Sequence, residues 1–382
     1  MISSHNNLIF VDFELKIDIV LLVFTEDNVE KLTLEAILKF FVQTIFYILV
    51  VSILGSCSSG SFINTKPISM SQKPTSIVVL QIAGLGVTHL GALRFAVEND
   101  QDIDVLQSYT CTGISYPQNF YSMRLSALDS MNAQILGSKS INRSCQDYEL
   151  TPFWERIQAK QKNVVMLEIE SDGQNSLEEK KDCSGKQFVK DMVLFKMSSV
   201  STSEKKRFSS KDKGEKSIGV YYDFNCNKEK CSSTAEENIR YVMENFFAKN
   251  KNTVFVIRDF KYKKLIEQKK FRDAFVYLRS LINSLNSEDW AISKPQNILT
   301  LVVGSDSREL EFPNTSKGWN DMIKYGKGRL FQYGGLQNLV IAGGASSENF
   351  CGTYFESELV SKMFFHVLRK SSITDFFSEF NL

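Results

Sequence analysis

The chain has 382 residues, of which 43% are hydrophobic and 23% charged, a composition typical of a globular protein with a sizeable core. Its formal net charge of +1 becomes informative only when the chain is divided: beyond residue 56 it has 42 basic and 37 acidic residues, a net of +5. That excess is too weak to argue for nucleic acid, so no nucleic-acid partner is expected. Many of the extra basic residues lie in the hydrophilic stretch 204–216, which we interpret as a solvated loop rather than a binding patch.

The first predicted element is an apolar segment at residues 40–54, which contains no charged residue. It is shorter than the roughly 20 residues of a membrane-spanning helix and is typical of the apolar core of a secretory signal. The residues that follow, Leu54-Gly55-Ser56-Cys57, resemble the lipobox of bacterial lipoproteins, in which the cysteine becomes the lipidated N-terminus after cleavage. The resemblance implies a lipid on Cys57 and a place in the bacterial cell envelope. The alternative is an uncleaved anchor helix.

The lipobox divides the chain into segments. Residues 1–39 form an acidic leader that is longer than a signal normally carries, so we predict that the start codon is misassigned. Lipoproteins of this kind tend to stay at the inner membrane when Asp follows the cysteine, so Ser58 favours the periplasm-facing outer membrane. The lipid anchors the protein to the membrane, and an envelope ligand or protein is the expected partner. The other segments are the signal with its lipobox, a flexible tether, the folded domain and a tail, at 40–56, 57–75, 76–370 and 371–382.

Cysteine usage agrees with export. Six cysteines remain after Cys57, an even number that predicts three disulfides in an oxidising compartment. Two of them, Cys226 and Cys231, are near enough in sequence to close a small loop. A zinc site is poorly supported because no histidine lies near, and free buried cysteines are the remaining alternative. The six are Cys111, Cys145, Cys183, Cys226, Cys231 and Cys351.

Apolar and amphipathic runs alternate along the domain. Continuous apolar runs predict buried strands at 77–82, 163–169, 253–257, 298–303 and 336–342. Capped or amphipathic segments predict helices at 151–157, 233–248, 269–285 and 356–368. Strands that alternate with helices indicate an α/β fold, with a largely parallel central sheet covered by helices on both faces. The polar region 171–216 is predicted to be an insertion made of loops.

Four segments between residues 75 and 355 resemble, in their order, the alkaline phosphatase superfamily in its phosphodiesterase and sulfatase branches. These enzymes begin with an apolar strand that ends in a metal-binding Asp, where this chain has Ala83. They then place a Thr, Ser or Cys nucleophile in a loop before a helix. The loop 110–119 matches this place, so the resemblance implies Ser115, or else Thr112, as the nucleophile. A helix at 120–128 would then direct its N-terminus at the substrate phosphate.

The metal ligands of these enzymes are matched only in part. The family's Asp-x-x-x-His corresponds to Asp259 and Lys263, and its Ser-Asp-His-Gly corresponds to a segment in which Ser307 follows Asp306. Asp259 and Asp306 are either ligands of one hard cation or solvated residues at strand ends, and they cannot build a two-metal centre. Lys263 is either a surface lysine or a cation that replaces part of the metal's charge. None of the three histidines stands at a ligand position of the family: His5, His89 and His366.

These observations favour a lipid-anchored domain with an alkaline-phosphatase-like fold and a degenerate metal site, which binds a ligand or acts structurally without hydrolysis. We expect no cofactor, with a single divalent metal ion as the alternative. A second hypothesis is an active phosphoester or sulfoester hydrolase with a reduced site around Ser115, Asp259 and Asp306. A third is an unrelated α/β surface protein, in which these positions would not converge.

Overall fold

The structure is a computed structural model, and it describes Gln43 and the ranges 74–96, 109–122, 124–157, 163–171, 173–198, 206–211, 216–226, 231–247, 252–286, 298–331 and 336–368. Apart from Gln43, the apolar segment 40–54, Cys57 and the sequence of the lipobox lie outside the described residues. Within the ranges given above, none of the helices has the length and apolar character needed to cross a membrane.

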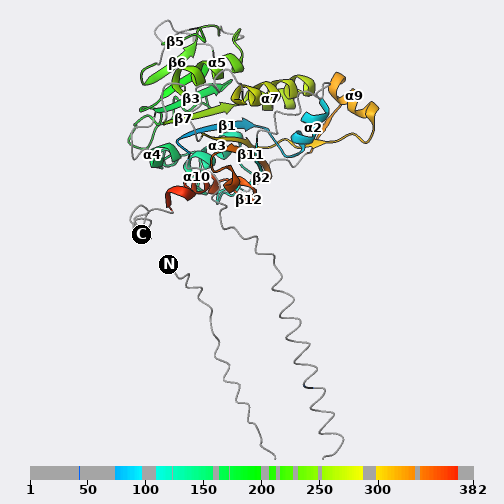
Figure 1. Cartoon of the computed structure of the whole chain (residues 1–382), viewed down its shortest axis with the longest axis horizontal. Coiled ribbons are helices and arrows are strands. Elements are labelled where there is room, and N and C mark those ends of the chain that lie inside the picture. Colours follow the sequence, from blue (N-terminus) through cyan, green and yellow to red (C-terminus); the bar gives the residue numbers. More distant parts are fainter. Residues whose placement is uncertain are drawn as a thin grey trace, which may run out of the picture. The chain divides into compact units, whose positions relative to one another are not determined.

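The fold is built on a ten-stranded sheet (Figure 1). Every pair of neighbouring strands is parallel except that β11 is antiparallel to both β2 and β8. The predicted α/β fold with a largely parallel sheet is therefore confirmed. In spatial order the strands are β12 (Gly352–Phe355), β2 (Cys111–Tyr116), β11 (Asn338–Gly344), β8 (Ile298–Ser305), β1 (Ser76–Ala83), β7 (Thr253–Asp259), β3 (Asn163–Ile169), β4 (Val193–Met197), β6 (Gly219–Asp223) and β5 (Arg207–Phe208).

Helices cover both faces of the sheet (Figure 1). One face packs against α2 (Thr88–Ala96), α5 (Ala235–Val242), α6 (Lys261–Glu267), α7 (Phe271–Asn286) and α9 (Ser316–Tyr325). The other face packs against α3 (Ala127–Leu136), α4 (Phe153–Ile157) and α10 (Glu358–Leu368). Successive residues of β1 point to opposite faces, so Val78 and Leu80 join the first core while Ile77 and Val79 join the second. Such two-sided burial explains why the central strands read as continuous apolar runs.

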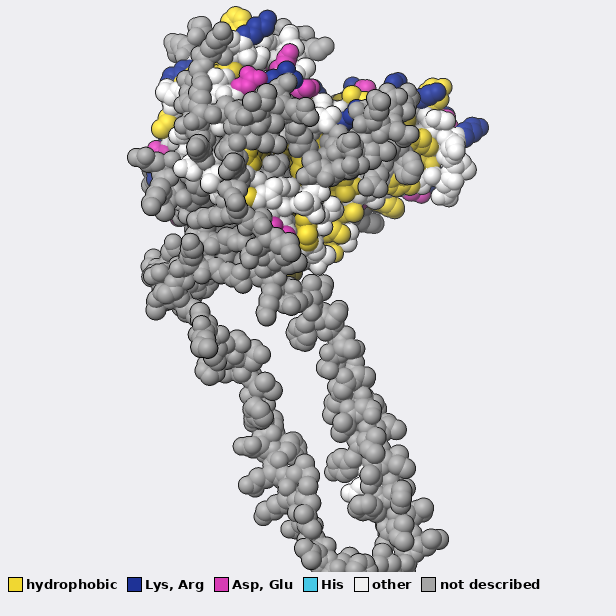
Figure 2. Space-filling view, in the orientation of Figure 1, with side chains coloured by type: hydrophobic (Ala, Val, Ile, Leu, Met, Phe, Trp, Pro, Cys, Tyr) yellow, Lys and Arg dark blue, Asp and Glu magenta, His cyan; other side chains and the backbone are white. Residues whose placement is uncertain are grey.

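Smaller elements complete the domain. A π-helical turn, Met243–Phe247, continues α5, and two 3-10 turns lie at Cys145–Glu149 and Ser347–Phe350. A short antiparallel ribbon pairs β9 (Leu310–Glu311) with β10 (Arg329–Leu330). On the face of the molecule shown in Figure 2, Lys and Arg side chains are scattered among acidic, apolar and uncharged ones, as the near-zero net charge would suggest.

Two local predictions are wrong. The predicted loop 110–119 contains strand β2, and the helix expected at 120–128 begins only at Ala127. That helix starts there because the Ser126 hydroxyl accepts a hydrogen bond from the Asp129 amide, and it ends at Gly137, which adopts the left-handed conformation at φ 66°. The predicted loop insertion 171–216 contains β4, a buried strand between β3 and β6. Lys196 is tolerated inside β4 because its ammonium pairs with Glu178 at 2.6 Å.

The prediction of three disulfides is confirmed, and the structure gives their pairing. Cys111 at the start of β2 bonds Cys351, and Cys226 bonds Cys231 to close the predicted small loop. The third disulfide joins Cys145 to Cys183 and ties two surface segments together.

Candidate functional site at the strand ends

The strand-end residues singled out from the sequence lie at one edge of the sheet. In the pairing register Ile82 lies opposite Asp259 and Ala83 lies opposite Ser305, so the carboxyl ends of β1, β7 and β8 are adjacent. Ser115 is paired with Asn338, whose side-chain oxygen accepts a hydrogen bond of 3.1 Å from the Ser307 amide after β8. The positions predicted from the sequence therefore lie at one edge of the sheet, and at such edges parallel strands commonly bring functional groups together.

The end of β1 is covered by apolar side chains. Ala83 is completely buried and forms a small cluster with Ala127, Met131 and Phe260. Ala127 and Met131 belong to the first turns of α3, so this helix stands directly on the strand end at which the resemblance expects a metal-binding Asp. An apolar contact therefore occupies the place of one expected ligand.

Asp259 is buried and engaged by donors from two helices. One of its oxygens accepts a hydrogen bond of 2.6 Å from the Tyr277 hydroxyl of α7, and the other accepts one of 3.0 Å from the Tyr262 amide of α6. Burial raises the pKa of the carboxyl to about 6, and both hydrogen bonds act against that rise. Asp259 thus anchors α6 and α7 to the end of β7.

Asp306 is held by two cations. Its Oδ2 lies 2.6 Å from Lys263 Nζ and 3.2 Å from Arg308 Nη2, and Glu267 pairs with the same two cations at 3.8 and 3.0 Å. Lys263 can reach Asp306 because α6 passes close to Gly84, where an added Cβ would meet Lys263 Cα at 3.0 Å. Lys263 is therefore not a free surface lysine: it supplies positive charge to Asp306.

The residues present do not fit a two-metal centre. Ala83 offers no ligand, Lys263 replaces the histidine of the first motif, and Ser307 replaces that of the second. Asp259 directs its oxygens at Tyr262 and Tyr277, and Asp306 directs one at two cations. A single divalent ion bound to Asp306 would first have to displace Lys263 and Arg308 from it.

The structure places both candidate nucleophiles on β2, and their catalytic role stays a prediction. Ser115 is buried, and its hydroxyl finds no partner among the residues described; Thr112 is exposed. The residue that stands between a loop and a helix is Ser126, which donates a hydrogen bond of 2.7 Å to the Asp129 carboxylate. The sequence reasoning missed it, although a Ser followed three residues later by an acid signals a helix start.

His89 is a packed core residue. Its ring nitrogens contact the Arg308 carbonyl oxygen at 2.6 Å and the Tyr262 hydroxyl at 2.9 Å. Burial lowers the pKa of the imidazole to about 4, although the Glu309 charge acts in the other direction. His89 therefore ties α2 to α6 and to the loop after β8, and it is neutral at pH 7.

A second buried carboxyl, Glu356, fixes α3 against the sheet. Its Oε1 accepts hydrogen bonds from Gln134 at 2.9 Å, from Asn338 at 2.6 Å and from the Ser130 hydroxyl. Burial raises the pKa of this carboxyl to about 7, and the three donors act against the rise. Gln134 also donates to the Gly304 carbonyl at 2.8 Å, which links α3 directly to β8.

Comparison with known proteins supports the fold. None of the protein-family models and none of the curated proteins matches the chain. Among solved structures, the alkaline phosphatase of the Antarctic bacterium TAB5 superposes with a TM-score of 0.57 at 12% identity, over 79% of this chain and 100% of that one. The cold-active alkaline phosphatase of the psychrophile Shewanella sp. gives a TM-score of 0.57 at 11% identity, over 76% and 99% of the two chains. The Thermus thermophilus alkaline phosphatase gives 0.51 at 9% identity, over 78% and 92%. A variant of the TAB5 enzyme holds Mg in its M3 site. The chain therefore has the fold of alkaline phosphatases.

Proposed function

We propose that this chain is an exported, lipid-anchored protein in which an alkaline-phosphatase-like fold serves binding or structure without hydrolysis. The observation that supports the proposal is the set of contacts at the carboxyl ends of β1 and β8. Ala83 packs against Ala127, Met131 and Phe260, while Asp306 is neutralised by Lys263 at 2.6 Å. An ammonium at this place supplies charge without the open coordination positions that metal-assisted hydrolysis requires.

A second candidate function is hydrolysis of a phosphate or sulfate ester with one divalent ion. It is favoured by the two carboxylates that remain at the ends of β7 and β8, the strands on either side of β1: Asp259 and Asp306. It also finds a parallel in the Mg held by the TAB5 variant. The two functions make opposite predictions for activity and metal content.

The purified full chain is expected to leave aryl phosphates and aryl sulfates intact and to contain less than one equivalent of metal. Both quantities can be measured on one preparation, by release of the coloured phenol and by elemental analysis. Matched Ser115→Ala and Ser126→Ala variants control for contaminating hydrolases, because Ser115 is the predicted nucleophile and Ser126 is the serine that precedes helix α3. Turnover that disappears in either variant, together with stoichiometric metal, would refute the non-catalytic function.

Lipidation is expected to depend on Cys57. Cells expressing the wild-type chain should incorporate a fatty-acid analogue into the protein, and the Cys57→Ala variant should incorporate none, because the lipid is attached to that sulfur. A Ser59→Ala variant, which changes a neighbour outside the lipobox, should be labelled like the wild type. Labelling that persists in Cys57→Ala would show that another residue carries the lipid, and a wild-type chain without label would indicate that the segment 40–54 is an uncleaved anchor.

A further inference from the structure

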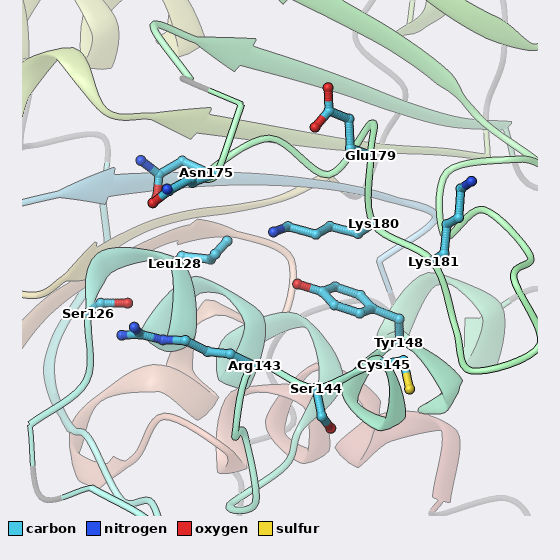
Figure 3. A pocket seen from close by; sticks show the side chains of 11 residues that line it. Ser126, Leu128, Arg143, Ser144, Cys145, Tyr148, Asn175, Glu179, Lys180 and Lys181 are labelled. Carbon is cyan, nitrogen blue, oxygen red and sulfur yellow. The ribbon is translucent and has the colours of Figure 1, made fainter.

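A cavity of about 580 Å³ lies at the start of α3, where its lining residues Ser126 and Leu128 flank Ala127 of the apolar cluster at Ala83. This volume is in the range of small-molecule binding sites. Its walls come from three parts of the chain: the start of α3, the segment 143–148 and the segment 174–181 (Figure 3). Most of the lining residues are polar or charged, and Leu128 and the ring of Tyr148 are among the apolar groups.

Lys180 is the central cation of the cavity. Figure 3 shows its side chain extending across the centre of the view, among the other side chains that line the cavity. Its main chain is held on both sides, since its amide donates to the Leu177 carbonyl at 3.2 Å and its carbonyl accepts from the Phe188 amide at 3.0 Å. Within the part of the chain that the structure describes, the Lys180 ammonium makes no hydrogen bond or ion pair. A half-buried ammonium in this state is well suited to bind an anion.

The other charges of the lining give the cavity a net positive character. Arg143 is paired with Asp129 at 2.6 Å, which leaves part of its guanidinium fork at the cavity wall. Lys181 adds a further cation, and Glu179 is the one acid among the lining residues. In Figure 3 Glu179 and Lys181 lie further from Tyr148 than Lys180 does.

A buried ion pair holds the segment that carries Lys180. Arg258 is wholly buried and pairs with Glu168 at 3.1 Å, and its Nε and Nη2 donors find no partner among the described residues. Burial raises the pKa of the Tyr148 hydroxyl, and the Asn132 hydrogen bond and the Arg258 charge act against the rise. Glu168 also accepts a hydrogen bond of 2.8 Å from the Leu177 amide, so the same ion pair holds the segment that carries Lys180.

The cavity is built from fixed walls. The disulfide between Cys145 and Cys183 joins the segment of Arg143 and Tyr148 to the segment of Lys180. The Tyr148 ring meets the Phe188 ring edge to face, with centroids 5.4 Å apart. Preformed walls lower the ordering cost of binding a small ligand.

We propose that this cavity binds a small hydroxylated organic anion, with Lys180 as the main contact of its oxyanion group. The Tyr148 hydroxyl, the Ser126 and Ser144 hydroxyls and the Asn175 amide suit hydroxyl groups on the ligand body. The shared chemistry is an oxyanion, carried either as a phosphate or as a carboxylate. The proposal rests on the binding role given above as the proposed function, and it names the ligand class and the site.

The test measures binding of three probes to the purified full chain by calorimetry: glucose 6-phosphate, galacturonate and uncharged glucose. At least one anionic probe should bind, and it should bind more tightly than glucose. Lys180→Gln should weaken it by about tenfold, the usual effect of losing one charge-assisted hydrogen bond. Lys317→Gln is the matched control, because it removes an equal charge from the exposed surface of α9 and should leave binding unchanged. Tyr148→Phe provides a second variant, which should weaken binding without altering charge.

Two outcomes would overturn the cavity assignment: no saturable binding of either anion up to about 10 mM, or equal binding by Lys180→Gln and Lys317→Gln. Binding of glucose 6-phosphate would indicate a phosphate ligand, and binding of galacturonate would indicate a carboxylate ligand. Either result supports the site. Released inorganic phosphate is measured in the same samples. Its appearance would refute the non-catalytic function, whereas loss of binding in Lys180→Gln would still uphold the cavity.

Discussion

Replacing Glu168 with glutamine is expected to lower the free energy of unfolding by about 3–5 kcal/mol. Glu168 and Arg258 are completely buried and 3.1 Å apart on the neighbouring strands β3 and β7. Glutamine keeps the shape of the side chain but cannot balance the charge of the Arg258 guanidinium. Burial lowers the pKa of Arg258, and the Glu168 charge raises it, so removing that charge leaves the buried cation without compensation. Urea denaturation followed by circular dichroism measures the loss.

The matched control is Glu236→Gln. It makes the same chemical change in an exposed ion pair, in which the Glu236 side chain is 41% exposed and the Arg240 side chain 44% exposed. A pair of this kind contributes about 0.5 kcal/mol or less. Combining Glu168→Gln with Arg258→Met should recover most of the lost stability, because no unpaired charge remains buried. A loss below about 1 kcal/mol in Glu168→Gln would mean that the pair is not buried in the way the structure shows.

Restoring the family's aspartate at the end of β1 is expected to destabilise the fold rather than to rebuild a metal site. Ala83→Asp places a carboxyl against Ala127, Met131 and Phe260, in a position that is 0% exposed. A buried carboxyl without a partner, with the overpacking it causes, should cost about 3 kcal/mol or more. The melting temperature of the variant should stay the same when Mg²⁺ or Zn²⁺ is added.

Ala83→Asn serves as the control for size, since it has nearly the shape of aspartate without the charge. The difference between the two variants therefore reports the cost of the carboxyl itself. If Zn²⁺ or Mg²⁺ raised the melting temperature of Ala83→Asp and not that of Ala83→Asn, the strand edge would still be a metal site. The non-catalytic function proposed above would then lose its main support.

The sequence predicted the centre of the sheet well and its margins poorly. The central strands β1, β7 and β8 are buried on both faces, so their apolar runs are continuous and easily recognised. Strand β2 alternates buried with exposed or half-buried residues and contains Gly113, which made it read as a loop. Strand β4 contains Lys196, and its burial depends on Glu178, a contact that no local pattern reveals.

The same division holds for the site. The shared edge of Ala83, Asp259 and Asp306 follows from strand direction, which the apolar runs already give. The pairing of Lys263 with Asp306 depends on the close approach of α6 to the Gly84 turn. The sequence therefore offered Lys263 only as a possible replacement for part of a metal's charge, without naming its partner. The cavity around Lys180 could not be found from sequence, because its walls meet through the disulfide of Cys145 and Cys183.

The disulfide between Cys111 and Cys351 makes the stability of this fold depend on the redox conditions around it. It joins two cysteines 240 positions apart in sequence, a span that contains eight of the ten strands of the sheet, and it fastens β2 to the segment that enters β12. A crosslink across so long a loop lowers the conformational entropy of the unfolded chain, which stabilises the fold by about 5 kcal/mol. This is comparable to the total stability of many domains. In a reducing solution the chain lacks that restraint and stays easier to unfold. Once the disulfide forms, the unfolded chain is restrained over most of the domain, so the fold should be more stable under oxidising than under reducing conditions.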